Sequence, residues 1–233
     1  NPDGKVVQQP STHLLKQEFA KAFDVKFKDK EGNDKYAFIT CYGPAVSRIF
    51  ASVIIVHGDD KGLKFPWEIA PIQVVIVPID NNDEKIKKTA KNLKEQIEKF
   101  ASVKIDFSEK RPGEKFNYWE MKGVPIRIDI GAKDLKNKKI TLFRRDLDKK
   151  IVVSHEKVLN EIKKIAKETT KNLIKKADKL FNNKIKDAKS LSEIKKIINE
   201  EGIARIPFCS VEKQGEKCAG IIEKEISAQV RGT

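Results

Sequence analysis

The spacing of apolar residues changes from one part of this 233-residue chain to the next, and each spacing predicts a different element. Before residue 57, short apolar runs between turn residues predict strands at 25–27 and 36–42, and the apolar residues between 14 and 23 have a roughly helical spacing. The run at 49–56 is apolar at almost every position. Periodicity therefore leaves the choice between a buried helix and a buried strand open for this run.

Strand-like and helix-like segments alternate between residues 72 and 153. The predicted elements are, in order, a strand at 72–78, a helix over 86–100, a strand at 103–107, a short helix at 116–122, and strands at 124–130 and 139–143. Alternation of this kind implies helices packed on a mainly parallel or mixed sheet. The join at 57–71 holds several Gly and Pro residues, and it predicts a domain boundary.

The last third of the chain is mainly helical by its pattern. Residues 154–201 keep a spacing of three or four between apolar positions, with Ser154 as the predicted N-cap of a long helix and Ser190 at the start of a second. A strand at 203–208, a helix at 218–226 and a strand at 228–231 are predicted to follow. We therefore expect three domains, at 1–70, 71–153 and 154–233.

The chain carries a formal net charge of +14, from 48 basic and 34 acidic residues. A surplus of this size favours a polyanionic partner, because neutralising phosphates releases counterions. The alternative source of much of this excess is a lysine-rich, AT-biased genome. Residues 149–189 hold thirteen lysines and five acidic residues. This segment is interpreted either as an RNA-facing helix or as a solvated face.

The three cysteines, Cys41, Cys209 and Cys218, are widely spaced and odd in number. Such a set argues against a disulfide framework and for a reducing compartment, so we expect a cytoplasmic protein. No apolar run in the sequence reaches the ~20 residues of a membrane span. The first residues lack the basic start and apolar core of a signal peptide, and there is no initiator methionine, so the chain is expected to be a fragment.

Two stretches carry specific motifs. The first holds CYGPAVSR at 41–48, HGDDKGL at 57–63 and APIQVVIVP at 70–78, and the second holds RPGEKF at 111–116 and WEMKGVPIR at 119–127. The first resembles the third signature motif of class II aminoacyl-tRNA synthetases running into their anticodon-binding domain. The second is similar to the anticodon-domain core of the archaeal and eukaryotic type. Together they look most like prolyl-tRNA synthetase, over nearly the whole chain.

The resemblance implies a fold and an activity. The fold class is α/β (α+β): the end of a class II antiparallel catalytic sheet, then a mixed-sheet α/β anticodon-binding domain, then an α+β C-terminal domain. The implied activity is that of a proline--tRNA ligase, which activates proline with ATP and Mg²⁺ and esterifies the 3′ end of tRNA(Pro). The resemblance also implies a homodimer formed through an N-terminal part outside this chain.

Five residues match family positions in the catalytic domain: the nucleotide contacts Gln8 and Ser11, the motif-3 arginine Arg48, and the proline-pocket positions His13 and Gly43. In the family the motif-3 arginine holds the terminal phosphate of ATP. A planar guanidinium suits this catalytic role of Arg48, because it grips phosphate oxygens in a bidentate way and neutralises the leaving pyrophosphate. Two prolines depart from the family pattern, since Pro10 replaces a usual glycine and Pro44 replaces a small aliphatic residue. Both stiffen the backbone.

Four residues are candidates for anticodon binding: Arg111, Glu120 and Lys122 for the bases, and Lys115 for the phosphates. Anticodons for proline share two adjacent guanines. A splayed guanine offers N–H donors to a carboxylate, and O6 and N7 acceptors to a cation. Trp119 is interpreted either as a stacking ring or as core packing. Arg144, Arg145 and Asp146 either touch the anticodon stem or pair locally.

Cys209 and Cys218 resemble the first of two cysteine pairs that bind zinc in the C-terminal domain of the family. A structural zinc site normally takes four ligands, so this pair predicts half of a Zn²⁺ site. A vestigial pair without metal is the alternative. Cys41, inside the motif-3 strand, is predicted to be a small buried hydrophobic residue.

Two alternative functions share these features. Threonyl-, histidyl- and glycyl-tRNA synthetases also combine motif 3 with an anticodon domain, although they do not typically carry the helical, cysteine-bearing tail that follows residue 154. The other alternative is a non-catalytic RNA-binding module derived from a synthetase. The sequence lacks the motif-2 arginine and most of the proline pocket. We therefore expect residues 1–233 alone to bind tRNA and to form no prolyl-adenylate.

Overall fold

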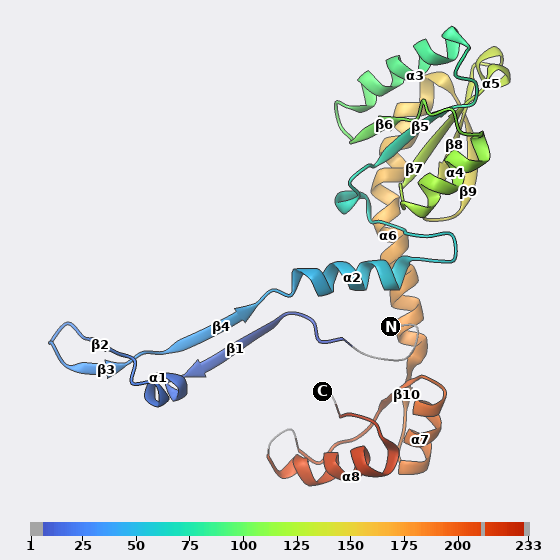
Figure 1. The fold of residues 1–233 in the computed structure, drawn as a ribbon. Coiled ribbons are helices and arrows are strands. Elements are labelled where there is room, and N and C mark those ends of the chain that lie inside the picture. Colours follow the sequence, from blue (N-terminus) through green and yellow to red (C-terminus); the bar gives the residue numbers. More distant parts are fainter. Residues whose placement is uncertain (1–6, 211–212, 231–233) are drawn as a thin grey trace. The chain divides into compact units, whose positions relative to one another are not determined.

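The computed structural model describes residues 7–210 and 213–230, and it contains two compact units, Asn1–Val56 and His57–Thr233 (Figure 1). The described residues of the first unit form two antiparallel strand pairs and two helices. Its elements are β1 (Ser11–Lys16) paired with β4 (Ile39–Gly43), β2 (Lys26–Lys28) paired with β3 (Asp34–Tyr36), α1 (Glu18–Ala22) and α2 (Val46–His57). The strand predicted at 25–27 is therefore present, one residue later.

The apolar spacing between residues 14 and 23 is divided between two elements. Leu14 lies in β1, opposite Thr40 of β4, and only Glu18–Ala22 forms a helix. The helical prediction for this segment is wrong in its first half, because pairing with β4 holds the chain extended there.

Two further predictions for this unit concern the strand at 36–42 and the apolar run at 49–56. The strand is divided, because β3 ends at Tyr36 and β4 begins at Ile39. The apolar run lies in the helix α2. A helix satisfies the backbone groups of such a run within the segment itself, without a neighbouring strand.

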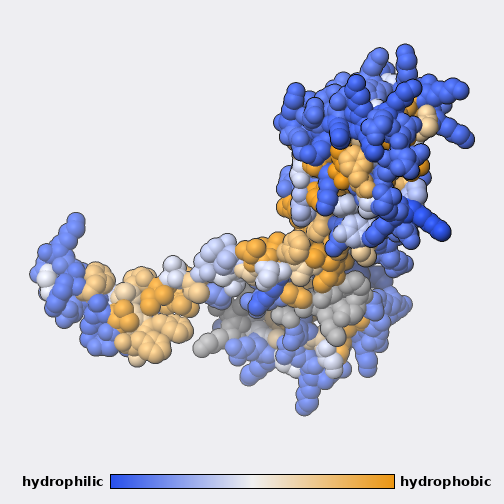
Figure 2. All heavy atoms as spheres, turned by 45° about the horizontal axis from the view of Figure 1, so that its top comes forward, coloured by the Kyte–Doolittle hydropathy of each residue, from blue (hydrophilic) through white to orange (hydrophobic). Residues whose placement is uncertain are grey.

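Most apolar side chains of the first unit are exposed. Among its described residues, Ala20 is the one buried hydrophobic residue. Leu14 is 65% exposed and Tyr42 is 69% exposed. Figure 2 shows apolar residues gathered over the strands and helices of this unit. The part of the unit that the structure describes therefore has no packed core of its own.

The second unit contains a five-stranded mixed sheet in the order β6-β5-β7-β8-β9. Its strands are β5 (Val74–Pro78), β6 (Val103–Ile105), β7 (Ile126–Ile130), β8 (Lys139–Arg144) and β9 (Lys149–Ser154). β5 runs parallel to β6 and β7, whereas β8 is antiparallel to β7 and β9. The prediction of helices packed on a mixed sheet is confirmed.

Helices pack on both faces of this sheet (Figure 1). α3 (Glu84–Ile97) and α6 (Val158–Lys184) share the main core with one face of the sheet, and α4 (Pro112–Met121) packs on the other face. The main core includes Val74, Ile76, Ile86, Leu93, Ile97, Ile126, Ile128, Ile130, Ile162 and Ile165. Because strand residues alternate in direction, Val75 and Arg127 lie on the α4 side.

The starts of α3 and α4 follow from the local sequence. Asp83 caps α3, because its Oδ1 accepts hydrogen bonds from two backbone N–H groups at 2.8 and 3.3 Å. α4 begins at Pro112, earlier than the predicted residue 116. Proline fits the first helical position, and the carboxylate of Glu114 accepts the N–H of Arg111 at 3.1 Å.

Three elements of this unit are absent from the prediction: α5 (Ala132–Lys136), β9 and the strand β10 (Ile185–Asp187). The helical prediction for 154–201 is wrong at 185–187, because these residues pair with Ile203–Arg205 as a strand. Ser154 is the last residue of β9 and pairs with Lys139. A 3-10 turn, His155–Lys157, separates it from α6, which begins at Val158. The prediction of Ser154 as the N-cap of the long helix is therefore wrong, because this residue completes a strand.

The C-terminal part of this unit has a small core of Ala188, Ile194 and Ile197. Its elements are β10 (Ile185–Asp187), which pairs in parallel with β11 (Ile203–Arg205), and the helices α7 (Leu191–Asn199) and α8 (Glu216–Ile226). Ser190 caps α7 as predicted, since its Oγ accepts the N–H of Glu193 at 3.3 Å. The strand predicted at 228–231 is wrong for 228–230, which are irregular, and residue 231 lies outside the described residues.

The structure divides the chain after Val56, whereas the sequence predicts boundaries after residues 70 and 153. Val158 and Ile162 of α6 belong to the core of the sheet, so the first half of α6 packs with that sheet. The three-domain division stays a prediction. Across residues 7–210 and 213–230, the helices fall short of the length and apolar character that crossing a membrane requires.

Candidate functional site

The strand pair β1–β4 brings three predicted residues of the catalytic domain together. Ser11 lies opposite Gly43, and His13 lies opposite Cys41. The Nε2 of His13 is 3.1 Å from the Oγ of Ser11. A Cβ added to Gly43 would lie 3.9 Å from the backbone and hydroxyl oxygens of Ser11. The predicted nucleotide and proline positions are therefore neighbours on one strand pair.

Arg48 lies on the first turn of α2, shortly after β4. Its Nη1 donates a hydrogen bond to the backbone carbonyl of Gln8 at 3.2 Å. Gln9 donates to the Oγ of Ser52 on the next turn of α2 at 2.9 Å. These two bonds hold the segment before β1 against the start of α2. Arg48 is exposed, so its guanidinium can also face an anion.

The turn from β4 into α2 is tight. Ala45 has a left-handed φ of 46° directly after Pro44, a conformation that non-glycine residues seldom adopt. This turn at Ala45 separates the end of β4 from the start of α2, so Arg48 lies five residues after the last residue of the strand. Cys41 is exposed. The prediction of a buried Cys41 is wrong, because the described residues of this unit form no layer over β4.

Arg127 is the centre of a polar cluster on the α4 side of β7. Its Nη1 donates to Oε1 of Glu120 at 2.6 Å, and its Nε donates to Oδ1 of Asp129 at 2.8 Å. The guanidinium lies between Phe116 and Phe143, at 3.9 and 4.6 Å from the ring centroids. Glu120, a predicted base reader, is thereby held in one orientation.

The centre of this cluster is buried. Arg127 is 3% exposed and Asp129 is 6% exposed. Burial raises the pKa of the Asp129 carboxyl above its usual range, although the Arg127 charge opposes the shift. Sequence reasoning missed both residues. The signal was the sequence IRIDI at 126–130, where two opposite charges share one face of a strand whose other face is apolar.

Trp119 belongs to the core on the α4 side. It is 5% exposed and packs in a cluster with Val75 and Val124, and its Nε1 donates to Oδ2 of Asp106 at 2.7 Å. This geometry supports core packing over stacking. Lys115 is 2% exposed, and its Nζ donates to the backbone carbonyl of Asp106 at 3.2 Å. Its contact with phosphates stays a prediction.

Arg111 and Lys122 are the exposed members of the predicted anticodon-binding set. The Nζ of Lys122 lies 5.7 Å from the ring centroid of Tyr118, and the Nζ of Lys110 lies 5.3 Å from it. A hollow of about 400 Å³ beside this ring is also lined by Lys115. The ring of Tyr118 on α4 therefore lies close to several cations.

Arg144 pairs locally at the end of β8. Its Nη2 donates to Oδ2 of Asp146 at 2.8 Å, and its Nη1 donates to Oε2 of Glu168 on α6 at 2.6 Å. Asn172 also donates to Asp146 at 2.8 Å. These bonds join the sheet to α6. For Arg144 and Asp146 the structure favours local pairing over contact with the anticodon stem.

Arg145 fixes the loop that follows α2 to the sheet. It is 1% exposed and donates from Nη1 to Asp59 at 3.0 Å and to Asp148 at 2.9 Å. Lys64 donates to Asp148 at 2.6 Å and lies 2.8 Å from Asp59. The Arg145 guanidinium, helped by Lys64, holds the pKa of Asp59 well below its usual range.

The two C-terminal cysteines meet in space. The Sγ atoms of Cys209 and Cys218 lie 3.0 Å apart. Across residues 7–210 and 213–230, however, no cluster of three or more His, Cys, Asp or Glu side chains could hold a metal ion. The described residues therefore fit two ligands of a zinc site and not a complete one.

Comparison with known proteins gives one consistent result. Residues 73–165 match the family described as "Anticodon binding domain". Over 100% of its length the chain is 40% identical to the proline--tRNA ligase of Thermofilum pendens, covering 48% of that protein. Over 99% of its length the chain is also 40% identical to the proline--tRNA ligase of Methanococcoides burtonii, and it covers 48% of that protein. Over its whole length the chain is similar to the C-terminal half of prolyl-tRNA synthetases.

The structural comparison agrees with this family. The prolyl-tRNA synthetase of Cryptosporidium parvum, complexed with L-proline and AMP, superposes with a TM-score of 0.87 at 32% identity, covering 97% of this chain and 46% of that one. The same synthetase complexed with halofuginone and AMPPNP superposes with a TM-score of 0.86 at 31% identity. The mixed α/β fold class is thereby confirmed. The chain spans about half the length of the curated prolyl-tRNA synthetases that it matches.

Proposed function

We propose that this chain supplies the ATP-phosphate arginine and the anticodon-reading domain of a proline--tRNA ligase. Such an enzyme activates proline with ATP and transfers it to the 3′ end of tRNA(Pro). The observation that carries the proposal is the similarity of the whole chain, from the strand pair to the cysteine tail, to proline--tRNA ligases. The L-proline, AMP and AMPPNP bound to a related synthetase support proline and ATP as the ligands.

In this proposal Arg48 holds the terminal phosphate of ATP and neutralises charge on the leaving pyrophosphate. Its bond to the carbonyl of Gln8 fixes the guanidinium and leaves other N–H donors for the phosphate. Gln8 and Ser11 contact the nucleotide. His13 and Gly43 border the proline. The register of β1 on β4, with Ser11 beside Gly43, supports the two ligands as neighbours. Mg²⁺ accompanies the ATP.

Glu120 is the proposed reader of guanine. Arg127 engages Oε1 of Glu120, and Oε2 then serves as an acceptor for the N–H donors of a splayed base. The Glu120 side chain is 15% exposed, so part of it reaches the surface. Arg111 and Lys122 supply exposed cations for O6 and N7. Lys115 contacts phosphate through the hollow that it lines.

Three further parts of the proposal rest on the family resemblance. Cys209 and Cys218 supply two thiolates of a Zn²⁺ site whose other ligands lie outside the described residues, and a bound zinc would stabilise the local fold. The enzyme acts in the cytoplasm. It assembles as a homodimer through a part that is not in this chain.

A non-catalytic tRNA-binding module is the second candidate. It is favoured by one observation: the second unit has a closed core, whereas the described residues of the first unit do not. A domain with its own core can bind RNA without a catalytic partner.

Binding of tRNA by the 233-residue chain tests the anticodon part of the proposal. We expect the chain to bind a tRNA(Pro) transcript at least about tenfold more tightly than a transcript in which adenines replace both guanines, because a wrong base costs about 1–3 kcal/mol. Glu120→Gln should narrow this ratio, since it removes the carboxylate charge. The exposed Glu156→Gln on the turn before α6 is the matched control and should leave the ratio unchanged. Equal binding of both transcripts by the unsubstituted chain would refute base reading.

Pyrophosphate exchange tests the division of labour within the proposed enzyme. We expect the 233-residue chain alone to show no proline-dependent exchange, while a full-length relative carrying the same motif-3 arginine does. In that relative, replacing this arginine with alanine should lower exchange by about 10²-fold or more, as loss of a charge-stabilising donor does elsewhere. Proline-dependent exchange by the chain alone would contradict the proposal.

A further inference from the structure

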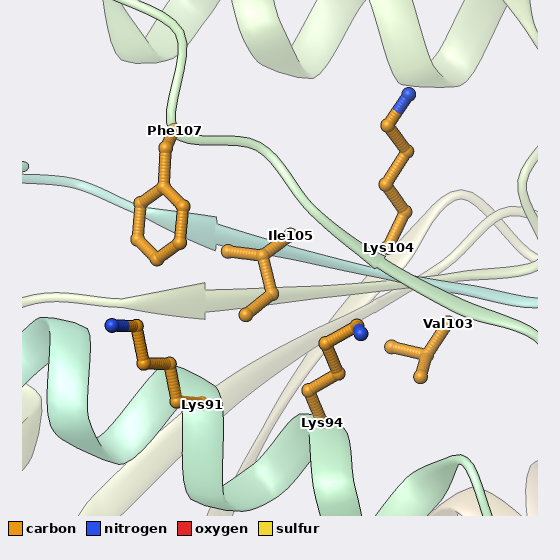
Figure 3. A pocket seen from close by; sticks show the side chains of 6 residues that line it. All are labelled: Lys91, Lys94, Val103, Lys104, Ile105 and Phe107. Atoms are coloured by element: carbon orange, nitrogen blue, oxygen red, sulfur yellow. The ribbon is translucent and has the colours of Figure 1, made fainter.

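Cys209 and Cys218 lie in the C-terminal part of the second unit, outside the residues 73–165 that match the anticodon-binding family. The hollow of about 510 Å³ beside β6, toward which Lys91 and Lys94 reach from α3 (Figure 3), lies within the matched segment. That hollow therefore belongs to the domain already proposed to read the anticodon. The two cysteines are a separate feature, and thiol chemistry needs no RNA.

The two thiols are in direct contact. The S–H of Cys209 donates to the Sγ of Cys218, with 3.0 Å between the sulfurs. A disulfide needs about 2.05 Å, so a shift of about 1 Å would join them. Two thiolates on one tetrahedral zinc ion, each about 2.3 Å from the metal, lie about 3.8 Å apart. The folded pair is therefore a dithiol that can close to form a bond or open to admit a metal.

Close packing of the segment before α8 holds the two thiols together. Gly215 directly precedes α8 and is buried. A Cβ added to Gly215 would collide with the backbone carbonyl of Ser210 and would lie 3.0 Å from the ring of Phe208. Cys209 stands between these two residues, and Cys218 is in the first turn of α8. The missing side chain at position 215 therefore lets Cys209 reach the helix.

The pair is open to an oxidant and short of metal ligands. Cys209 is exposed and Cys218 is partly buried, so a solute meets Cys209 first. Within 7–210 and 213–230 the chain offers the pair no third ligand from a cluster of His, Cys, Asp or Glu. In reducing compartments, disulfides are typically transient and redox-sensing. A contacting, accessible dithiol fits that chemistry.

We propose that Cys209 and Cys218 form a reversible disulfide when the chain meets a hydroperoxide. The Cys209 thiolate attacks one peroxide oxygen, the O–O bond breaks, and Cys209 becomes a sulfenic acid while hydroxide leaves and is protonated to water. The Cys218 thiolate then attacks the Cys209 sulfur, the S–O bond breaks, and a second hydroxide leaves as water. Two electrons pass from the sulfurs to the peroxide. A small thiol reverses the bond by thiol–disulfide exchange.

The disulfide changes what this part of the chain can bind. Once the two sulfurs are bonded to each other, neither is a thiolate that could hold Zn²⁺. The bond also ties the segment after β11 to the start of α8, between Ile206 and Ile226, which both pack on the small C-terminal core. The proposal goes beyond the proposed function, because it takes neither tRNA nor ATP as a ligand.

Thiol counting on the 233-residue chain tests the proposal. The reduced, EDTA-treated chain should react with maleimide at all three cysteines, and after hydrogen peroxide at Cys41 alone. Peptide mapping without reductant should recover the Cys209 peptide joined to the Cys218 peptide, and dithiothreitol should restore the three thiols. Three reactive thiols after peroxide, or thiols lost as sulfinic acids with no joined peptides, would overturn the proposal.

Two glycine variants test whether the fold brings the thiols together. Gly215→Ala should slow disulfide formation by about tenfold or more, because the added Cβ displaces residues 208–210 from α8. Gly220→Ala on the same helix is the matched control, since nothing lies within 4 Å of its added Cβ; its rate should be that of the unsubstituted chain. Equal rates for the two variants would mean that closeness in sequence alone joins the cysteines, and the fold-built pair would be refuted.

Two further controls keep the result interpretable. Circular dichroism must show that both glycine variants are folded; if Gly215→Ala is not, the unsubstituted chain in concentrated urea replaces it and should form disulfides more slowly and also with Cys41. Cys218→Ser should give no joined peptide and should leave a Cys209 sulfenic acid that dimedone traps. Guanine discrimination in tRNA binding uses none of these thiols, so the proposed function and this inference fail separately.

Discussion

The two units of this chain support their candidate sites in different ways. In the second unit, fifteen buried hydrophobic residues form one core, and all but Ala101 come from the sheet, α3 and α6. Glu120 and Arg127 lie on the opposite face of the same sheet. In the first unit, Ser11, His13 and Gly43 lie on a two-stranded sheet whose apolar side chains are largely exposed. An isolated strand pair of this kind has little stability in water.

The difference shows what each site depends on. The anticodon-binding face is positioned by residues of its own domain, so its geometry is a property of the second unit alone. The ATP-side residues are brought together by strand register and by the bond between Arg48 and Gln8. Their rigidity requires a surface that covers β1, β4 and α2, which the described residues of the first unit do not provide.

The largest expected effect comes from the core of the second unit. Ile128→Ala should lower the free energy of unfolding by about 2–5 kcal/mol, because Ile128 is 0% exposed and its loss leaves a cavity. Leu14→Ala, the matched truncation on β1 at 65% exposure, should change it by less than about 0.5 kcal/mol. Urea denaturation followed by circular dichroism measures both. Comparable losses would show that the strand pair is packed as tightly as the sheet.

A smaller loss in the free energy of unfolding is expected when the ion pairs of Arg145 are removed. These pairs hold the loop that follows α2 against the sheet. Arg145→Met should cost about 2–3 kcal/mol, less than a fully buried pair, because Asp59 and Asp148 keep 28% and 29% of their side-chain exposure. Arg205→Met is the control, since Arg205 and its partner Asp187 are 71% and 69% exposed. Its denaturation midpoint should not move. Equal shifts for the two variants would rule out a special role for the buried pair.

The smallest effect is a pH dependence. The folded pKa of Asp59 lies below its unfolded value, so its ion pairs stabilise the fold fully above about pH 4. This stability is lost as the pH falls from there through the folded pKa. Asp59→Asn should therefore show a shallower decline in its urea midpoint than the unsubstituted chain as the pH is lowered from 5 to 3. A decline as steep as that of the unsubstituted chain would place the acid-sensitive group elsewhere.

Local patterns in the sequence determined much of the fold. The alternation of apolar strands and amphipathic helices predicted the mixed sheet with α3 packed on it, because burial of one face imposes a period on each element. The start of the second C-terminal helix at Ser190 was also predicted, because a serine before an apolar helical repeat can accept a backbone N–H of the first turn. The motifs at 41–48 and 111–127 placed Arg48 and Glu120 in one family, and the chain is similar to members of that family over its whole length.

The tertiary structure decided what depends on distant neighbours. It made 49–56 a helix, buried Trp119 against β5, and placed Arg127 between two rings beside Glu120. The sequence shows that a residue is apolar or charged. Which face another element covers depends on packing between segments far apart in the chain, and that packing leaves β6 as an open, lysine-lined edge.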